Sequence, residues 1–262
     1  MSTFQQFLDT QQYSLRSINR YEKIFGPGYV STGGQDTTTD FVAKLNLKPG
    51  QRVLDVGCGI GGGNFYMAEK FGADVLGIDL SKNMIQVALD RAEERRDLKV
   101  KFAVEDATTV DYEPESFDVV YSRDTILHIE DKAALFAKFY KWLKPGGIVM
   151  ISDYCCGSQQ PSERFRVYVA QRGYHLLTPP EYGKVLGASG FIDVQAEDLT
   201  DRFIQVLTSE LARTKACKDD FIADTSQEDY DAIITGWEAK IQRCGDGDQK
   251  WGFFMAKKPM AQ

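Results

Sequence analysis

The most constraining feature of this sequence is the segment Val53–Gly63, which reads Val-Leu-Asp-Val-Gly-Cys-Gly-Ile-Gly-Gly-Gly. Its first residues are an apolar run typical of a buried strand, and its glycines predict a tight loop that leads into a helix over Gly62–Phe71. Glycine lets the backbone approach a bound ligand closely and adopt dihedral angles that other residues avoid. The segment therefore predicts a strand, a ligand-binding loop and a helix, the opening unit of an α/β fold.

The glycine spacing alone leaves two interpretations open. Gly57, Gly59 and Gly62 match the G-x-G-x-x-G pattern of dinucleotide sites, but a glycine-rich turn between strand and helix can also be purely structural. Asp55 lies inside the strand, two residues before the first glycine. A carboxylate there repels a pyrophosphate and attracts a cation. S-adenosylmethionine carries a sulfonium and an amino group but no phosphate, so the sequence favours a methyl-donor site over a nicotinamide site.

Two further acids follow predicted strands. Asp79 ends the second strand, where an acid accepts hydrogen bonds from ribose hydroxyls; the alternative is a helix cap, a role that Ser81 can fill instead. Asp106 follows the third strand, where a carboxylate can accept from the exocyclic amine of adenine. The residues alone leave Asp106 equally open to being a surface acid.

Short apolar runs alternate with helical stretches along the chain, which predicts a mostly parallel sheet covered by helices. The pattern changes after Asp153, and the last two strands are expected to form an antiparallel edge. The turn Lys144-Pro145-Gly146-Gly147 is expected to stop the preceding helix. The predicted strands are Arg52–Val56, Asp74–Ile78, Lys99–Val104, Phe117–Ser122, Gly147–Asp153, Phe191–Glu197 and Lys250–Lys257, and further helices are predicted over Lys82–Glu94 and Lys132–Leu143.

Composition excludes several classes of protein. A net charge of −7 argues against nonspecific binding of nucleic acid, and no apolar run approaches the roughly 20 residues that a membrane helix needs. The first residues lack the features of a signal peptide. The chain has five cysteines without metal-ligand spacing and two histidines, so we expect reduced thiols in a cytoplasmic protein and no metal site.

The three acids, the glycine loop and the Lys-Pro-Gly-Gly turn together resemble class I S-adenosylmethionine-dependent methyltransferases over residues 50–155. The resemblance implies a Rossmann-like fold with a mostly parallel seven-stranded sheet, one antiparallel edge strand and a helical lid. We expect one domain over residues 1–262. It would comprise an N-terminal helical lid (1–47), a donor-binding α/β core (48–155) and a substrate-binding lid with the last two strands (156–262).

The end of the fourth predicted strand exposes Arg123, Asp124 and His128 within six residues. A lone histidine is more often a core or capping residue than a catalytic one. Asp124 lies four positions before His128, so the two could share one face of a helix. That arrangement favours a functional role for both.

Several segments along nearly the whole chain closely resemble phosphoethanolamine N-methyltransferases. They span residues 7 to 257 and include Gln12-Tyr13, Tyr21-Glu22-Lys23-Ile24-Phe25-Gly26, Tyr29-Val30-Ser31-Thr32-Gly33-Gly34, Tyr121 to His128, Ile151-Ser152-Asp153-Tyr154-Cys155, Tyr168 through Tyr174, and Gly236-Trp237 through Lys240.

This family transfers methyl groups from S-adenosylmethionine to the amine of phosphoethanolamine or its partly methylated forms, ending at phosphocholine. The resemblance places the family's catalytic pair on Tyr13 and His128. It places the methyl-donor contacts on Val30, Ser31, Gly57, Asp79, Leu80, Asp106, Ala107 and Arg123, beside Asp55 and Gly59 of the loop. It places the phosphobase contacts on Gln12, Tyr21, Asp124, Tyr154, Tyr168, Arg172, Tyr174 and Lys240.

These residue types suit the implied chemistry. A protonated amine must lose a proton before it can attack, and His128 can remove it directly or through Tyr13. Tyrosine faces attract methylated cations, while Arg172 and Lys240 can hold the phosphate. The alternatives are another small-molecule amine methyltransferase, with a glycine-type substrate, and a non-catalytic donor-binding subunit. We expect a monomer. The glycine loop and Ser152-Asp153-Tyr154-Cys155 resemble the second, later-acting domain of two-domain members of the family, which favours mono- and dimethylated phosphobases as substrates.

Overall fold

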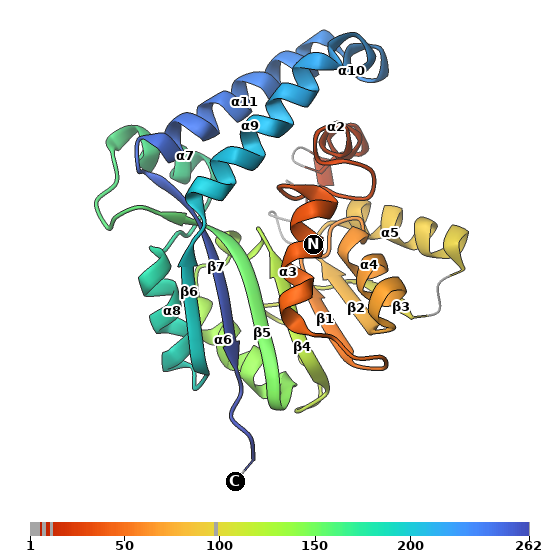
Figure 1. Ribbon diagram of the computed structural model, residues 1–262, viewed down its shortest axis with the longest axis vertical. Coiled ribbons are helices and arrows are strands. Elements are labelled where there is room, and N and C mark those ends of the chain that lie inside the picture. The colour runs from red at the N-terminus through yellow and green to blue at the C-terminus, as the bar shows by residue number, and fades with distance from the viewer. Residues whose placement is uncertain (1–5, 7–8, 11–12, 97–98, 262) are drawn as a thin grey trace.

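A seven-stranded sheet forms the centre of the molecule (Figure 1). The computed structural model describes residues 6, 9–10, 13–96 and 99–261. The strands lie in the order β3-β2-β1-β4-β5-β7-β6 and comprise β1 (Arg52–Val56), β2 (Asp74–Asp79), β3 (Val100–Val104), β4 (Phe117–Arg123), β5 (Leu143–Cys156), β6 (Ile192–Asp198) and β7 (Gln249–Lys257).

The predicted mostly parallel sheet with an antiparallel element near one edge is confirmed. β3, β2, β1, β4 and β5 pair in parallel, whereas β7 runs antiparallel to both of its neighbours, β5 and β6. The reversed strand is therefore inserted beside β5, and β6 forms the outermost edge. This is the strand arrangement of a Rossmann-like class I methyltransferase, as the sequence predicts.

Helices cover both faces of the sheet and one of its ends. They are α2 (Leu15–Phe25), α3 (Gly34–Leu45), α4 (Gly62–Phe71), α5 (Lys82–Arg95), the short 3₁₀ helix η2 (Ile126–His128), α6 (Lys132–Trp142), α7 (Glu163–Arg172), α8 (Pro179–Ala188), α9 (Thr200–Ala216), α10 (Lys218–Asp224) and α11 (Gln227–Gly245). Figure 1 shows α2, α7 and the long α9–α11 pair gathered at the same end of the sheet. None of the helices in these described ranges is both long enough and apolar enough to cross a membrane.

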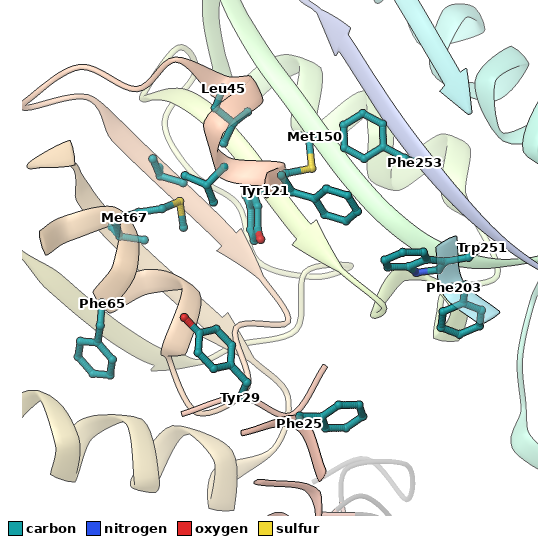
Figure 2. Packing of buried hydrophobic residues seen from close by; sticks show 14 of the residues in the cluster. Phe25, Tyr29, Leu45, Phe65, Met67, Tyr121, Met150, Phe203, Trp251 and Phe253 are labelled. Atoms are coloured by element: carbon teal, nitrogen blue, oxygen red, sulfur yellow. The ribbon is translucent and has the colours of Figure 1, made fainter. Parts of the chain in front are cut away.

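Successive side chains along each strand point to opposite faces of the sheet, so the protein has two hydrophobic cores, one on each face. Val53 and Tyr121 point into a cluster shared with α2, α3, α4, α9 and α11, whereas Leu54 and Val120 point into a cluster shared with α6 and α8. Figure 2 shows part of the first cluster, in which Phe203 and Trp251 stack with ring centroids 5.1 Å apart. Both faces of the central strands are buried, so these strands are apolar on both sides.

One predicted boundary differs from the structure. The Lys144–Gly147 turn lies within the bounds of β5, because pairing with β4 starts at Leu143 and resumes at Ile148 after a register shift. Opposite this shift, β4 advances only from Phe117 to Val119. The turn residues therefore form an irregularity in the strand, where Gly146 adopts φ +77°.

Candidate active site

Gly57 and Gly59 adopt left-handed backbone conformations that bring the loop close to neighbouring segments. Their φ angles are +79° and +55°. A Cβ atom at Gly57 would lie 2.0 Å from Thr125 Oγ1, and one at Gly59 would lie 2.7 Å from Val30 Cγ2. The amide of Gly57 donates a hydrogen bond to the carbonyl of Ile78 at 2.8 Å. The loop is thus fixed to the end of β2 in a form that favours glycine at both positions.

Two carboxyl groups lie next to this loop. Burial raises the pKa of Asp55 to about 8; the Arg123 guanidinium opposes this rise and the Asp79 carboxylate adds to it. Burial also raises the pKa of Asp79 to about 6, although its oxygens accept hydrogen bonds from the amides of Ser81 (2.9 Å) and Gly59 (3.0 Å). A ligand that brings positive charge or hydrogen-bond donors is therefore favoured here.

Ser81, not Asp79, caps the following helix. Its side chain accepts a hydrogen bond from the amide of Met84 at the start of α5. Asp79 is then left to hold the glycine loop and to line the cavity beside it.

Two adjoining hollows of about 410 and 80 Å³ lie at the carboxyl ends of β1, β2 and β4. Both are lined by Gly57 and Asp79, and together we call them the glycine-loop cavity. Open α/β sheets bind ligands at this end of their strands. Further lining residues are Tyr13, Val30, Ser31, Asp55, Gly59, Leu80, Asp106, Ala107, Arg123, Asp124, Thr125 and His128.

A second hollow of about 170 Å³, which we call the tyrosine cavity, lies under the helices at that end of the sheet. Its walls are aromatic rings interrupted by cationic side chains and one carboxyl group. Such a lining suits a small molecule that carries an anion at one end and a cation at the other. The lining includes Tyr13, Tyr21, Asp124, His128, Tyr154, Tyr168, Arg172, Tyr174, Trp237, Lys240 and Arg243.

The cationic side chains of the tyrosine cavity lie against aromatic rings. The Arg243 guanidinium carbon lies 3.8 Å from the centroid of Tyr168. Lys240 Nζ lies 4.4 Å from the centroid of Trp237 and donates a hydrogen bond to Tyr154 Oη at 3.2 Å. Burial lowers the pKa of Lys240 to about 8, partly offset by the charges of Glu210 and Asp124. These cations are held in place before any anion arrives.

The interpretation that Asp124 and His128 share one face of a helix is wrong. Asp124 directly follows β4 in a left-handed conformation, with φ +50°, and His128 closes the separate 3₁₀ helix η2. The amide of Asp124 donates to the carbonyl of Ser152, and its carboxylate accepts a hydrogen bond from Trp251 Nε1 at 2.9 Å. Both residues nevertheless line both cavities, because the strand end and the turn bring them to the same place.

His128 has the environment of a neutral imidazole. Burial lowers its pKa to about 4, and the positive charges of Arg172 and Lys132 act in the same direction. Its ring meets Tyr174 edge to face, with centroids 5.2 Å apart. At neutral pH His128 is therefore in the form that accepts a proton.

Tyr13 lies in a turn, two residues before the first residue of α2. Ser14 caps that helix, and Asn83 Nδ2 at the start of α5 donates a hydrogen bond to the carbonyl of Tyr13 at 2.9 Å. Tyr13 lines both the glycine-loop and tyrosine cavities.

Comparisons with known proteins agree with this geometry. A family model described as "Methyltransferase domain" matches residues 47–178. Phosphoethanolamine N-methyltransferase of Plasmodium falciparum is 38% identical to this chain over 96% of the chain and 95% of its own length. The chain belongs to the phosphoethanolamine N-methyltransferase family.

Other members of the phosphoethanolamine N-methyltransferase family are longer. Phosphoethanolamine N-methyltransferase 1 of Arabidopsis thaliana is 59% identical over 97% of this chain but only 52% of its own length. The structure of Haemonchus contortus phosphoethanolamine N-methyltransferase 2 with phosphomonomethylethanolamine and S-adenosylhomocysteine has a TM-score of 0.96 at 42% identity, and covers 99% of this chain and 61% of that one. The chain thus spans about half the length of the curated plant relatives that it matches.

The positions implied by the resemblance to phosphoethanolamine N-methyltransferases gather around the two cavities, apart from Gln12, which lies outside the described residues. Arg123 is buried and donates to the carbonyl of Thr32 and the hydroxyl of Thr38. It therefore holds the segment with Val30 against the glycine-loop cavity. Among the described residues, no group of three or more His, Cys, Asp or Glu side chains could hold a metal ion.

Sequence reasoning missed several residues of the site. Trp237 and Arg243 line the tyrosine cavity from α11, and Trp251 on β7 holds Asp124. Trp237 belongs to a segment that resembles the family, but the sequence spacing does not show that its ring packs against the Lys240 ammonium. Arg243 and Trp251 gave no sequence signal, since only the tertiary fold brings them to the site.

Proposed function

We propose that this chain transfers a methyl group from S-adenosylmethionine to the amine of a phosphobase, namely phosphoethanolamine or its mono- and dimethyl forms, on the route to phosphocholine. One observation carries the proposal: Tyr13, Asp124 and His128 line both the glycine-loop cavity and the tyrosine cavity. A donor in the first cavity and an amine in the second would meet at these three residues. Membership of the phosphoethanolamine N-methyltransferase family supports this arrangement.

The glycine-loop cavity fits S-adenosylmethionine. When bound, this molecule supplies an electrophilic methyl carbon on its sulfonium. Asp55 is a buried carboxyl group whose pKa of about 8 would fall toward its ordinary value beside a cationic amino group. Asp79 lines this cavity and would accept hydrogen bonds from ribose hydroxyls. A Cβ atom at Gly57 or Gly59 would clash with Thr125 or Val30, which line the same cavity.

His128 would act as the general base on the amine. A protonated amine has no free lone pair, so a proton must leave before the nitrogen can attack. The neutral imidazole can take it directly or through the Tyr13 hydroxyl, which lines the same cavities. Asp124, which lines the same cavity, would hold the ammonium form in place beforehand. Transfer would then depend on holding the nitrogen close to the methyl carbon and in line with it.

The cationic side chains of the tyrosine cavity would hold the phosphate. Arg172, Lys240 and Arg243 bring positive charge, and the rings of Tyr154, Tyr168 and Tyr174 face the same space. Charge-assisted hydrogen bonds from these side chains can fix a dianion. As methyl groups accumulate, the head group loses donors, and cation–π attraction to the rings takes over from hydrogen bonding.

The solved relative from Haemonchus contortus, bound to phosphomonomethylethanolamine, supports a monomethylated substrate for this chain as well. We further propose that residues 1–262 work as one domain and as a monomer, in which 1–47 form a lid over the 48–155 core and 156–262 supply a substrate-binding lid together with the last two strands. All five cysteines are free thiols, which supports a cytoplasmic location.

The deciding experiment incubates the purified chain with labelled S-adenosylmethionine and each of the three phosphobases separately. We expect label in at least the product of the monomethyl form, with inhibition by phosphocholine. Transfer to glycine derivatives without inhibition by phosphocholine would instead identify another amine methyltransferase. Calorimetric binding of S-adenosylhomocysteine with no transfer to any of the phosphobases would indicate a non-catalytic donor-binding subunit.

A further inference from the structure

A buried lysine lies behind the turn that carries His128. Lys132 is the first residue of α6, and its side chain is buried beneath η2. Its Nζ donates hydrogen bonds to the carbonyl of Ile126 at 2.9 Å, of Ile129 at 2.7 Å and of His175 at 2.7 Å. Two of these carbonyls flank His128, and the third follows Tyr174. One side chain thus ties together the two segments whose rings meet edge to face in the tyrosine cavity.

The three hydrogen bonds to carbonyl groups also indicate the protonation state of Lys132. A neutral amine has two N–H donors and a lone pair, whereas an ammonium has three donors. All three hydrogen bonds can form together only if the group is the ammonium. A buried charge of this kind is retained only where it is paired and hydrogen-bonded.

Asp153 on β5 is the carboxyl group that acts most strongly on Lys132: burial lowers the pKa of Lys132, and Asp153 opposes this shift. Burial raises the pKa of Asp153 to about 8 against the lowering effect of Lys132. Its carboxyl group accepts hydrogen bonds from the hydroxyl of Tyr182 at 3.2 Å and from the backbone amide of Leu127. The backbone of Leu127 also accepts at its carbonyl from the amide of His175, at 2.7 Å. The turn is therefore held on both sides of His128, through its N–H groups and through its carbonyls.

We propose that Lys132, together with Asp153, is a positioning residue that fixes the His128 imidazole against Tyr174 for proton abstraction in the tyrosine cavity. The inference rests on the proposed methyl transfer, but Lys132 itself lines neither cavity. It acts through the backbone of the turn and through its charge. A displacement of about 1 Å in a catalytic group is enough to slow a reaction by about 100-fold.

The electrostatic part of the proposal depends on the groups that surround His128. Burial is the largest influence on its pKa, followed by the positive charges of Arg172, Lys132 and His175. Loss of the Lys132 ammonium would therefore raise the pKa of His128. The other charged or titratable groups on the described elements around it include Tyr13, Tyr21, Asp124, Glu130, Asp131, Asp153, Tyr154, Tyr168, Tyr174, Lys240 and Arg243.

The first test compares Lys132→Met with Lys141→Met. Lys141 lies on the same helix, is partly exposed and pairs with Asp111 at the surface. We expect Lys132→Met to lower kcat by about 100-fold while the affinity for S-adenosylhomocysteine stays within about threefold of the original. Lys141→Met should leave both values unchanged. A folded Lys132→Met variant with kcat within about threefold of the original would overturn the proposal.

The second test separates positioning from general loss of structure. The chain has only two histidines, so the imidazole carbon-bound protons of His128 and His175 can be followed individually by NMR, with His175→Gln for assignment. We expect the His128 titration, and the acid limb of kcat/KM, to move to higher pH in Lys132→Met. A large loss of kcat with an unmoved His128 titration would assign Lys132 a structural role only and overturn the proposal.

If Lys132→Met does not fold, Tyr182→Phe tests the same network from its far side. This variant removes one hydroxyl donor to Asp153 and leaves both cavities intact. We expect a severalfold loss of kcat at unchanged donor affinity, and an unchanged kcat would refute the positioning network. The NMR titration needs no substrate, so it tests the positioning role of Lys132 even if the proposed function is wrong. Failure of the proposed function would instead appear as a wild-type protein that transfers no methyl group to any phosphobase.

Discussion

Asp55→Asn should raise the free energy of unfolding of the ligand-free protein and, at the same time, lower its affinity for the methyl donor. Asp55 is buried, and its pKa rises from 3.8 to about 8 on folding. An acid with a raised pKa binds its proton more tightly in the folded state than in the unfolded state. The free energy of unfolding therefore falls as the pH rises from about 4, where only the unfolded form ionises, and stops falling near pH 8.

The size of the effect follows from the pKa shift. Each pH unit between 4 and 8 costs about 1.4 kcal/mol, so the cost reaches on the order of 4 kcal/mol at pH 7. Asparagine has nearly the same shape and no charge to bury. The free energy of unfolding of Asp55→Asn minus that of the original protein should thus grow by about 1.4 kcal/mol per pH unit. For a protein of this size, each kcal/mol raises Tm by roughly 2–4 °C.

Denaturant melts of both proteins at pH 5, 6 and 7 measure that slope directly. A stability difference that does not change with pH would refute the reasoning, because it would mean that burial imposes no charge cost on Asp55. Calorimetry with S-adenosylhomocysteine gives the second readout. Loss of a hydrogen bond between charged groups, worth about 1.5–3 kcal/mol, should weaken binding by about 10- to 100-fold. Unchanged affinity would remove Asp55 from the donor site.

Three further predictions concern two of the residues that line both cavities and one cation of the tyrosine cavity. His128→Ala should abolish nearly all methyl transfer while circular dichroism and donor-product affinity stay unchanged, and an active variant would exclude His128 as the base. Tyr13→Phe should slow single-turnover methyl transfer strongly at unchanged donor affinity, so full activity would remove the hydroxyl from the mechanism. Lys240→Met should raise the KM for the phosphobase by about 10- to 100-fold, as expected for loss of a charge-assisted hydrogen bond. Because the pKa of Lys240 is about 8, the original protein should lose substrate affinity above that pH; Lys240→Met should not, and a KM equally pH-dependent in both would contradict this role.

The donor half of the site was predictable because its signals are local in sequence. Gly57 and Gly59 need positive φ angles, and Asp55 and Asp79 stand at the ends of adjacent parallel strands that pair in register. Strand alternation and glycine placement are properties of short segments. The approximate positions of the strands and the mostly parallel sheet followed in the same way, apart from the irregular start of β5 at Leu143.

The substrate half depends on contacts that no local pattern encodes. The sequence pattern put Asp124 on one helix face with His128. In the structure Asp124 adopts a left-handed conformation, and its carboxylate accepts a hydrogen bond from Trp251 Nε1, a residue distant in the sequence. Lys132 looked like an ordinary helix-start residue, since a buried ammonium differs from an exposed one only through tertiary contacts. The family resemblance named the lining tyrosines, but not the residues that hold the lining in place.

One buried carboxyl group links the walls of the donor half and the substrate half of the site. Glu210 on α9 is 1% exposed; one of its oxygens accepts from the amide of Gly33 at 2.7 Å, and the other from Trp237 Nε1 at 2.8 Å. Gly33 closes the segment with Val30 that lines both cavities, and Trp237 lies beneath the Lys240 ammonium. Glu210 therefore connects α9 to α11 and to the segment that contains Val30, and its two hydrogen bonds join the walls of the two cavities.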